Sequence, residues 1–246
     1  MDRMLYIAMS GARELMQAQA VNTNNLANAS TVGFKQDLDA FQAVPIAGPG
    51  YASRIYTTDG GQGTDTSQGA MMTTDRPLDI AVDGPGWIAV QAPDGREAYT
   101  RSGDLRITSN GLLTTSQGYP VLGNSGPIAV PPNQQLHIGH DGTITVEPSG
   151  QQPSALAVVD RIKLVNPPRN SLAKGTDGLM HTRDGRVLAP SADVSVVAGA
   201  LETSNVNTVD ALVRMIALAR QYETQIKLMK TAENNDQASA QLLLAG

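Results

Sequence analysis

Apolar side chains at the two ends of the chain recur with the spacing of a helix. At the N-terminal end, over about residues 3–29, the seam positions alternate three and four residues apart: Leu5, Ala8, Ala12, Leu15, Gln19, Asn22, Leu26 and Ala29. Near the C-terminal end, over about residues 207–244, the same spacing recurs at Leu212, Met215, Ala219, Tyr222, Ile226 and Met229. This heptad spacing predicts one long helix at each end of the chain, each with a seam along one side.

The two seams allow two interpretations. An amphipathic helix most often packs on the core of its own domain. The alternative is that the two end helices pair with each other as a coiled coil, and small residues such as Ala8 and Ala12 would permit a close approach. We favour pairing because the segment after the first helix offers no nearby core. Ser204 or Asn205 is the expected N-terminal cap of the second helix.

Between these helices the pattern changes to the alternation of β-strands. From Arg76 onward, apolar and polar residues alternate, and pairs such as Asn110-Gly111 and Asp141-Gly142 mark turns. The expected strands lie at 78–82, 87–91, 99–102, 105–108, 112–115, 119–122, 128–130, 136–138, 143–146, 155–159 and 162–165. Short strands separated by frequent turns indicate an antiparallel sandwich or barrel. Residues 166–200 are rich in turns, and the pattern assigns no elements there.

Residues 36–75 have neither period. They are rich in glycine, and a structureless segment of this length is uncommon inside a compact domain. We expect an extended arm that becomes ordered against neighbouring molecules; a plain flexible linker is the alternative.

The expected fold class is therefore α+β. Residues 1–35 and 202–246 would form a terminal coiled-coil domain, residues 36–75 an extended glycine-rich arm, and residues 76–201 a central all-β domain.

Composition narrows the range of functions. The chain of 246 residues has 24 Gly, 14 Pro and a net charge of −5, with no basic stripe that would suit nucleic acid or an anionic membrane. It has no cysteine, which excludes disulfides and thiol catalysis. No apolar run approaches the roughly 20 residues that span a bilayer, so we expect no membrane insertion. The apolar run Leu5–Met9 is too short for a cleavable signal peptide, and we expect none.

Catalytic chemistry has little support in the sequence. His137 and His140 could suggest a metal, but residues three apart on a strand face opposite sides. No phosphate loop, dinucleotide fingerprint or nucleophile elbow occurs. We therefore expect no catalytic, cofactor or metal site, and not an enzyme.

The polar stretch from Asn22 to Lys35 stands out because it is rich in asparagine where a helix should be apolar. From physical chemistry alone, an ordinary helix end followed by a turn explains it. Its residues form a longer pattern at Asn24, Asn25, Leu26, Ala27, Asn28, Thr31, Gly33, Phe34 and Lys35. A second pattern near the C-terminal end comprises Ser204, Asn205, Val206, Val209, Met215, Ile216, Tyr222 and Glu223. A third lies in the strand-rich region at Asp83, Gly84, Gly86, Trp87, Tyr99, Thr100, Arg101, Gly103 and Asp104.

Together these patterns resemble those of the flagellar rod and hook proteins of bacteria. The opening residues are most similar to proximal-rod members, with distal-rod or hook members as the alternative. The resemblance implies a structural subunit of the proximal rod in the basal body, located in the periplasm. Such a subunit would assemble helically with itself and with other rod proteins by stacking its terminal coiled coils, transmit torque, and be exported by the flagellar type III apparatus. A free-standing β-rich binding or adhesive protein is the second class of function that the residues leave open.

Overall fold

The computed structural model describes residues 2–45, 55–148, 157–168 and 171–244. The chain forms two compact units, which we consider separately. The helical unit comprises residues 1–29, 36–65 and 206–246, and the β-rich unit comprises residues 30–35 and 66–205. The α+β class predicted from the sequence is confirmed.

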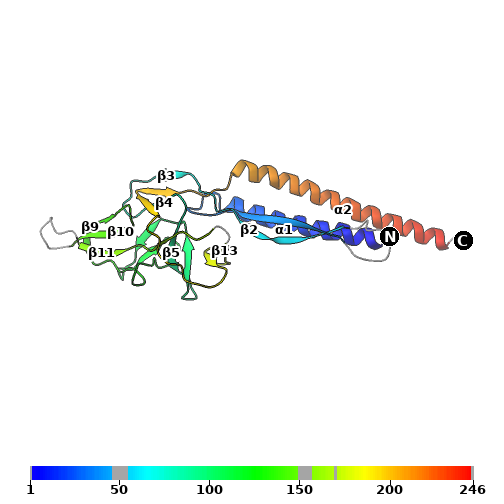
Figure 1. Cartoon of the computed structure of the whole chain (residues 1–246). Helices are drawn as coiled ribbons and strands as arrows, with labels where there is room; N and C mark the ends of the chain where they lie inside the picture. Colours follow the sequence, from blue (N-terminus) through cyan, green and yellow to red (C-terminus); the bar gives the residue numbers. More distant parts are fainter. Residues whose placement is uncertain (1, 46–54, 149–156, 169–170, 245–246) are drawn as a thin grey trace. The chain divides into compact units, whose positions relative to one another are not determined.

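Two long helices build the helical unit. Helix α1 spans Asp2–Ala27 and helix α2 spans Thr208–Leu244, close to the two ranges predicted from the heptad spacing. The helices lie side by side and run in opposite directions (Figure 1). Asn22 near the end of α1 donates to the carbonyl of Ala211 at the start of α2 at 2.8 Å. Further along, a Cβ placed on Gly11 would lie 3.3 Å from the side chain of Gln225.

The cap of α2 differs from the prediction. Asn207 Oδ1 accepts hydrogen bonds from the backbone amides of Val209 and Asp210, at 3.0 and 3.3 Å. This is the geometry of an N-cap residue, so Asn207 caps the helix, and Ser204 and Asn205 do not. Asn205 instead directs its side chain to Ser67.

The segment after α1 is not structureless. Strands β1, Asp37–Pro45, and β2, Ile55–Thr64, pair as an antiparallel hairpin that contacts α1. Asn25 ties the hairpin to the helix, because its side chain both donates to the carbonyl of Asp37 and accepts from the amide of Asp37, each at 2.8 Å. The expectation of a structureless arm is therefore wrong for these two ranges. Glycines in β2 hide the strand pattern, since its pairing depends on backbone bonds to β1 that no local pattern records. The middle of the expected arm, residues 46–54, lies outside the described residues.

Fourteen short strands build the described part of the β-rich unit. They are β3 Met71–Thr73, β4 Ile80–Asp83, β5 Trp87–Gln91, β6 Glu97–Thr100, β7 Leu105–Ile107, β8 Leu113–Thr115, β9 Asn133–Ile138, β10 Thr143–Pro148, β11 Ala157–Arg161, β12 Leu164–Val165, β13 Leu172–Lys174, β14 Met180–Thr182, β15 Ser195–Ala198 and β16 Ala200–Glu202. All their pairings are antiparallel, as predicted.

The strands form one five-stranded sheet, one three-stranded sheet and three pairs. The five-stranded order is β12-β5-β6-β14-β13, the three-stranded order is β11-β10-β9, and the pairs are β15-β4, β16-β3 and β7-β8. Strands β13 to β16 fall mainly in the region where the sequence pattern assigned no elements. Each has at most four residues, too few to display a period.

Large aliphatic side chains fill the centre of the β-rich unit. Ile80, Ile88, Leu105, Leu113 and Ile144 are fully buried in one cluster. A second cluster contains Trp87, the only tryptophan of the chain. The predicted turns are also present: Gly111 and Gly142 have φ angles of 77° and 83°, which glycine adopts without steric cost.

None of the described helices has a stretch long and apolar enough to cross a membrane.

Candidate functional site

The segment that follows α1, residues 30–35, belongs to the β-rich unit and is held there by its backbone. Gly33 has a φ of 67°, and its amide donates to the carbonyl of Glu202 at 2.8 Å. A Cβ on Gly33 would lie 2.3 Å from the backbone of Arg101, closer than any real contact. Only glycine therefore fits at this point of the motif.

A buried carboxylate lies beside this segment. The side chain of Glu202 is fully buried, and its Oε1 accepts from Lys35 Nζ at 2.5 Å and from the amide of Gly69 at 2.9 Å. Its Oε2 accepts from Arg101 Nη1 at 2.7 Å. The side chains of Lys35 and Arg101 are only 3% and 4% exposed. Charges taken this far from water persist only when they are paired and hydrogen-bonded, and each of these three is.

The two cations have further partners that fix their positions. Lys35 Nζ donates to the carbonyl of Ser67 at 2.6 Å. Arg101 Nη2 donates to the carbonyl of Gly84 at 2.8 Å, and its guanidinium lies over the ring of Trp87, 5.4 Å from the centroid.

Lys174 and Asn205 complete the arrangement. Lys174 Nζ donates to the carbonyl of Lys35 at 3.0 Å and lies 3.8 Å from the centroid of the Phe34 ring. Asn205 donates from its side chain to Ser67 and from its backbone to the carbonyl of Phe34. Three stretches of chain, residues 30–35, 66–69 and 202–205, are thus bonded to one another. We call this arrangement the clamp.

The clamp brings together residues from three separate sequence patterns. Lys35, Arg101 and Asn205 come from the N-terminal, central and C-terminal patterns respectively. Glu202, which bonds both cations, belongs to none of them and was missed by sequence analysis. The only local signal is an acid that follows two apolar residues, Ala200 and Leu201, in a strand of three buried residues.

The remaining motif residues divide between the two units. Asn24, Asn25, Leu26 and Ala27 form the last turn of α1, and Asn28 follows it with backbone bonds to Asn24 and Asn25. Thr31 lies within the clamp, and its carbonyl accepts a hydrogen bond from Phe34 N. Ser204 is buried in the β-rich unit, whereas Val206 is buried in the helical unit.

The predicted seam residues vary in exposure within one chain. Ala8 and Ala12 are buried; Leu15, Leu26, Met215, Tyr222 and Met229 are half-buried; Leu5, Leu212, Ala219 and Ile226 are exposed. On α2, the buried positions are instead Ala211, Leu218 and Ala232. Ala211 and Leu218 each lie one position before a predicted seam residue, Leu212 and Ala219 respectively. The side of α2 that is buried within the chain is therefore offset from the predicted seam. The apolar stripe of α2 is wide, and the sequence does not indicate that the side with the smaller side chains is the one buried within the chain.

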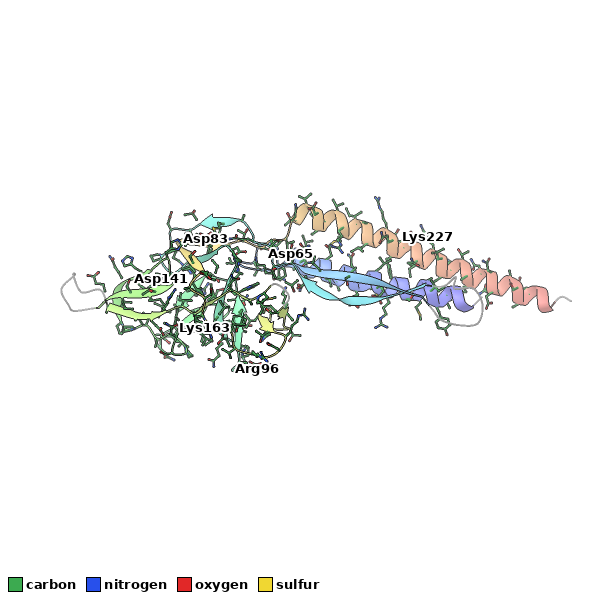
Figure 2. The ribbon with its side chains drawn as sticks, in the orientation of Figure 1. Asp65, Asp83, Arg96, Asp141, Lys163 and Lys227 are labelled. Atoms are coloured by element: carbon green, nitrogen blue, oxygen red, sulfur yellow. The ribbon has the colours of Figure 1, made fainter. Side chains whose placement is uncertain are left out.

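Both helices expose large apolar side chains. On α2, Val209, Leu212, Val213 and Ile216 are between 49% and 65% exposed. Their spacing of three and four residues places them on one face, away from Ala211 and Leu218. The same face becomes polar further along, where Lys227 projects from the helix (Figure 2). On α1, Leu5, Tyr6, Met9 and Met16 are between 38% and 59% exposed.

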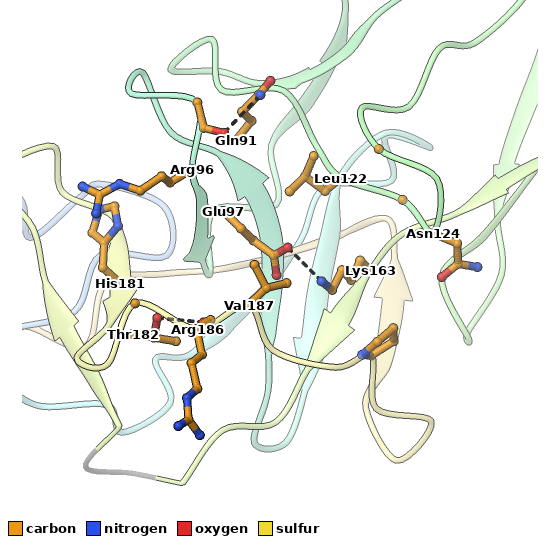
Figure 3. Close-up of a pocket in the computed structure, with 15 residues that line it drawn as sticks. Gln91, Arg96, Glu97, Leu122, Asn124, Lys163, His181, Thr182, Arg186 and Val187 are labelled. Carbon is orange, nitrogen blue, oxygen red and sulfur yellow. Dashed lines mark hydrogen bonds and ion pairs between the residues drawn. The ribbon is translucent and has the colours of Figure 1, made fainter.

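A separate pocket of about 520 Å³ lies beside β5 and β6 in the β-rich unit (Figure 3). Among the lining residues, Lys163 Nζ donates to Glu97 Oε2 at 2.8 Å, and both side chains are 11% exposed. Arg96 and Arg186 line the pocket as well, and pair with Asp94 and Asp184. The charges of these lining residues are thus balanced within the chain.

Tyr99 is bonded to Glu97 of this ion pair. Its hydroxyl donates to Glu97 Oε1 at 2.9 Å and accepts from the amide of Leu188 at 3.0 Å. Burial raises the pKa of the Tyr99 phenol well above its ordinary value. Within the described ranges, no three His, Cys, Asp or Glu residues gather as metal ligands would, and His137 and His140 belong to no such group.

Three family descriptions match successive parts of this chain. Residues 5–35 match "Flagella basal body rod protein", residues 81–146 match "Flagellar hook protein FlgE/F/G D1 domain", and residues 197–242 match "Flagellar basal body rod FlgEFG protein C-terminal". The three matches contain Lys35, Arg101 and Glu202 respectively. The chain belongs to the family of flagellar basal-body rod proteins.

Within that family it is similar along its whole length to proteins named FlgF. It is 41% identical to the flagellar basal-body rod protein FlgF of Salmonella typhimurium and 42% identical to that of Escherichia coli, with 99% of each chain covered in both comparisons. It is also 34% identical to the flagellar basal-body rod protein FlgG of Buchnera aphidicola, over 97% of this chain and 98% of that one. These relatives are named as rod proteins and not as enzymes.

Proposed function

We propose that this chain is a structural subunit of the proximal rod of the bacterial flagellar basal body. The observation that carries the proposal is the exposed apolar face at the start of α2, formed by Val209, Leu212, Val213 and Ile216. Large apolar patches on a soluble surface mark sites of protein association. The full-length similarity to rod proteins named FlgF supports the same role.

The two terminal helices pair, in this proposal, as a coiled coil that stacks against the helices of neighbouring subunits. The predicted seam residues fall into two groups with different partners. Ala8 and Ala12 face the other helix of the same chain, and exposed residues such as Leu5, Leu212 and Ile226 contact other subunits. Stacking of this kind would build a helical assembly that transmits torque.

The remaining parts of the chain have complementary roles in the proposal. The glycine-rich segment within residues 36–75 contacts neighbouring subunits, and the β domain of residues 76–201 forms a separate domain of each subunit. Partners are other rod subunits, further copies of this chain and, during export, the flagellar type III apparatus. The location is the periplasmic part of the basal body.

The clamp also supports this role. The chain passes from one unit to the other at four points, between residues 29 and 30, 35 and 36, 65 and 66, and 205 and 206. Three of the stretches that lead to these passages are bonded together in the clamp. Buried ion pairs are suited to holding these stretches in one arrangement within the β-rich unit.

The test is a charge placed on the exposed apolar face. Ile216→Asp should leave the fold of the purified chain unchanged, because Ile216 is already 56% exposed. In a strain that lacks the native protein, it should abolish rod assembly and swimming. Burying an aliphatic side chain of this size contributes roughly 1.5–3 kcal/mol per contact, and an unpaired carboxylate reverses the sign.

Gln221→Asp is the matched control. Gln221 is exposed on the same helix but on a different side, so this variant should assemble and swim normally. Normal swimming by Ile216→Asp would contradict the proposal. A free-standing binding protein, the alternative class, predicts in addition that both variants and the native chain remain monomeric at every concentration in sedimentation experiments.

A further inference from the structure

Three buried charged side chains meet in the clamp. Lys35 and Arg101 each carry one positive charge, and both bond the single carboxylate of Glu202. With Glu202 ionised, these three side chains sum to +1. Without its charge they would sum to +2, in a site where all three are less than 5% exposed.

Two cations that contact the two oxygens of one carboxylate lie within a few ångströms of each other. Their repulsion is weak in water but strong in a poorly solvated interior. Each cation also loses hydration on burial, and an opposite charge offsets much of that loss. Closure of the site around Lys35 and Arg101 is therefore stabilised by the Glu202 carboxylate, which bonds both side chains.

The counter-ion is also distant along the chain. Glu202 lies 167 residues after Lys35 and 101 residues after Arg101. It reaches the site only when β16 has paired with β3, because it is the last residue of β16 and its register partner is Met71. Closure at the N-terminal segment thus requires that the far end of the β-rich unit has already been built.

We propose that Glu202 acts as a counter-ion switch for the N-terminal segment 30–35. Until β16 is in place, repulsion between Lys35 and Arg101 keeps the segment undocked and accessible. When Glu202 arrives, the segment docks, Gly33 bonds the carbonyl of Glu202, and Phe34 packs under Lys174. The proposal concerns the order of folding within one chain and does not rest on the rod function.

Variants that change the net charge of these three side chains distinguish a counter-ion role of Glu202 from ordinary hydrogen bonding. Glu202→Gln keeps the shape of the side chain and one carbonyl acceptor but leaves two buried cations. Adding Lys35→Met to it restores the original net charge of +1 while removing still more hydrogen bonds. A counter-ion role predicts that the double variant is better docked than Glu202→Gln alone. A purely structural role predicts that it is worse.

The experiment is hydrogen exchange by mass spectrometry on full-length variants, read at the peptide that contains residues 30–35. The Gly33 amide is protected by a backbone carbonyl, so its exchange reports docking and not the loss of a side-chain bond. Glu202→Gln should exchange at least about a hundredfold faster than the native chain, as expected when a buried pair loses one partner. The double variant should exchange at least about tenfold more slowly than Glu202→Gln.

Glu97→Gln is the matched control. Glu97 is another buried acid of the β-rich unit, but it pairs with a single cation, Lys163. Its substitution should leave exchange of residues 30–35 unchanged. The fluorescence of Trp87, the only tryptophan of the chain, provides an independent readout because Arg101 lies over its ring. Its emission should shift in Glu202→Gln and return toward native in the double variant.

Each outcome decides the question. If the double variant exchanges as fast as Glu202→Gln or faster, the counter-ion switch is overturned. Native-like exchange in Glu202→Gln overturns it as well. If Glu202→Gln fails to fold while the double variant folds, the rescue itself supports the switch, and failure of both to fold refutes it.

Discussion

The two units of this protein bury very different side chains. In the β-rich unit the centre is filled by large aliphatic residues, many of them with no exposed surface, such as Ile88 and Leu113. On the two helices and at Val206 just before α2, the buried apolar residues are mostly alanines: Ala8, Ala12, Ala18, Ala211 and Ala232, with Leu218 and Val206 larger.

The large apolar residues of the helices are instead on the outside. Val213 and Ile216 on α2, and Tyr6 and Met9 on α1, are all about half exposed or more. Large apolar side chains contribute most to stability when they are buried, but these four are exposed to solvent. The β-rich unit therefore buries its large apolar side chains within a single chain, whereas the two helices leave many of theirs exposed.

The two units also bury polar groups in different ways. Asn22 and Asn25 in α1 bond backbone groups of α2 and β1, which fixes the helix without carrying charge. In the β-rich unit, full charges are buried in the clamp and in the Lys163–Glu97 pair. Buried charges require a surrounding structure that is already rigid, because any loosening leaves them unpaired.

The largest expected effect comes from opening a cavity in the β-rich core. Ile88→Ala should lower the free energy of unfolding of this unit by about 2–5 kcal/mol, since Ile88 is fully buried in the main cluster. The measurement is urea unfolding followed through Trp87 fluorescence. A loss below about 1 kcal/mol would contradict a tightly packed core.

Hydrogen exchange compares the two units in one experiment. In a dilute, verified monomer, amides of α1 and α2 should exchange at least about a hundredfold faster than those of β5, because helix pairs with an alanine interface have little tertiary stabilisation. In assembled material the helices should become protected. Equal protection of helices and β5 in the monomer would show that the helical unit is complete on its own.

A smaller effect is expected at the largest buried apolar side chain between the helices. Leu218→Ala should destabilise the helical unit by about 1–2 kcal/mol, less than Ile88→Ala, because Leu218 keeps 7% of its surface exposed whereas Ile88 is fully buried. Thermal melting followed by circular dichroism at 222 nm measures it. Gln221→Ala, an exposed neighbour on the same helix, is the control and should melt as the native chain does.

The smallest effect concerns Tyr99 at alkaline pH. Its pKa is raised in the folded state by burial, so the neutral phenol is the form that the fold accepts. The stabilisation is fully present below the unfolded pKa of about 10 and is lost as the pH rises above that value. Tyr99→Phe should therefore show a shallower loss of stability between about pH 10 and 11 than the native chain in urea titrations. Parallel slopes would rule out a contribution from Tyr99.

Local sequence determined the elements whose signals are short-range. Heptad spacing gave both helices to within a few residues, because one helical turn is specified by residues three and four apart. Alternation and glycine turns gave most strands from β4 to β12, and the motif residues identified the family. Gly33 also carried its own signal, since a positive φ is a property of the residue itself.

Tertiary structure decided what depends on residues far apart in the chain. The pairing of β1 with β2 and the face of α2 that meets α1 each required knowing which groups meet in space. The clamp is the clearest case. Lys35, Arg101 and Glu202 are separated by more than a hundred residues at their extremes, and no local pattern marks any of them as buried. The role of these three residues depends on charge neutralisation in a poorly solvated interior. That is a property of the folded arrangement and not of any single segment.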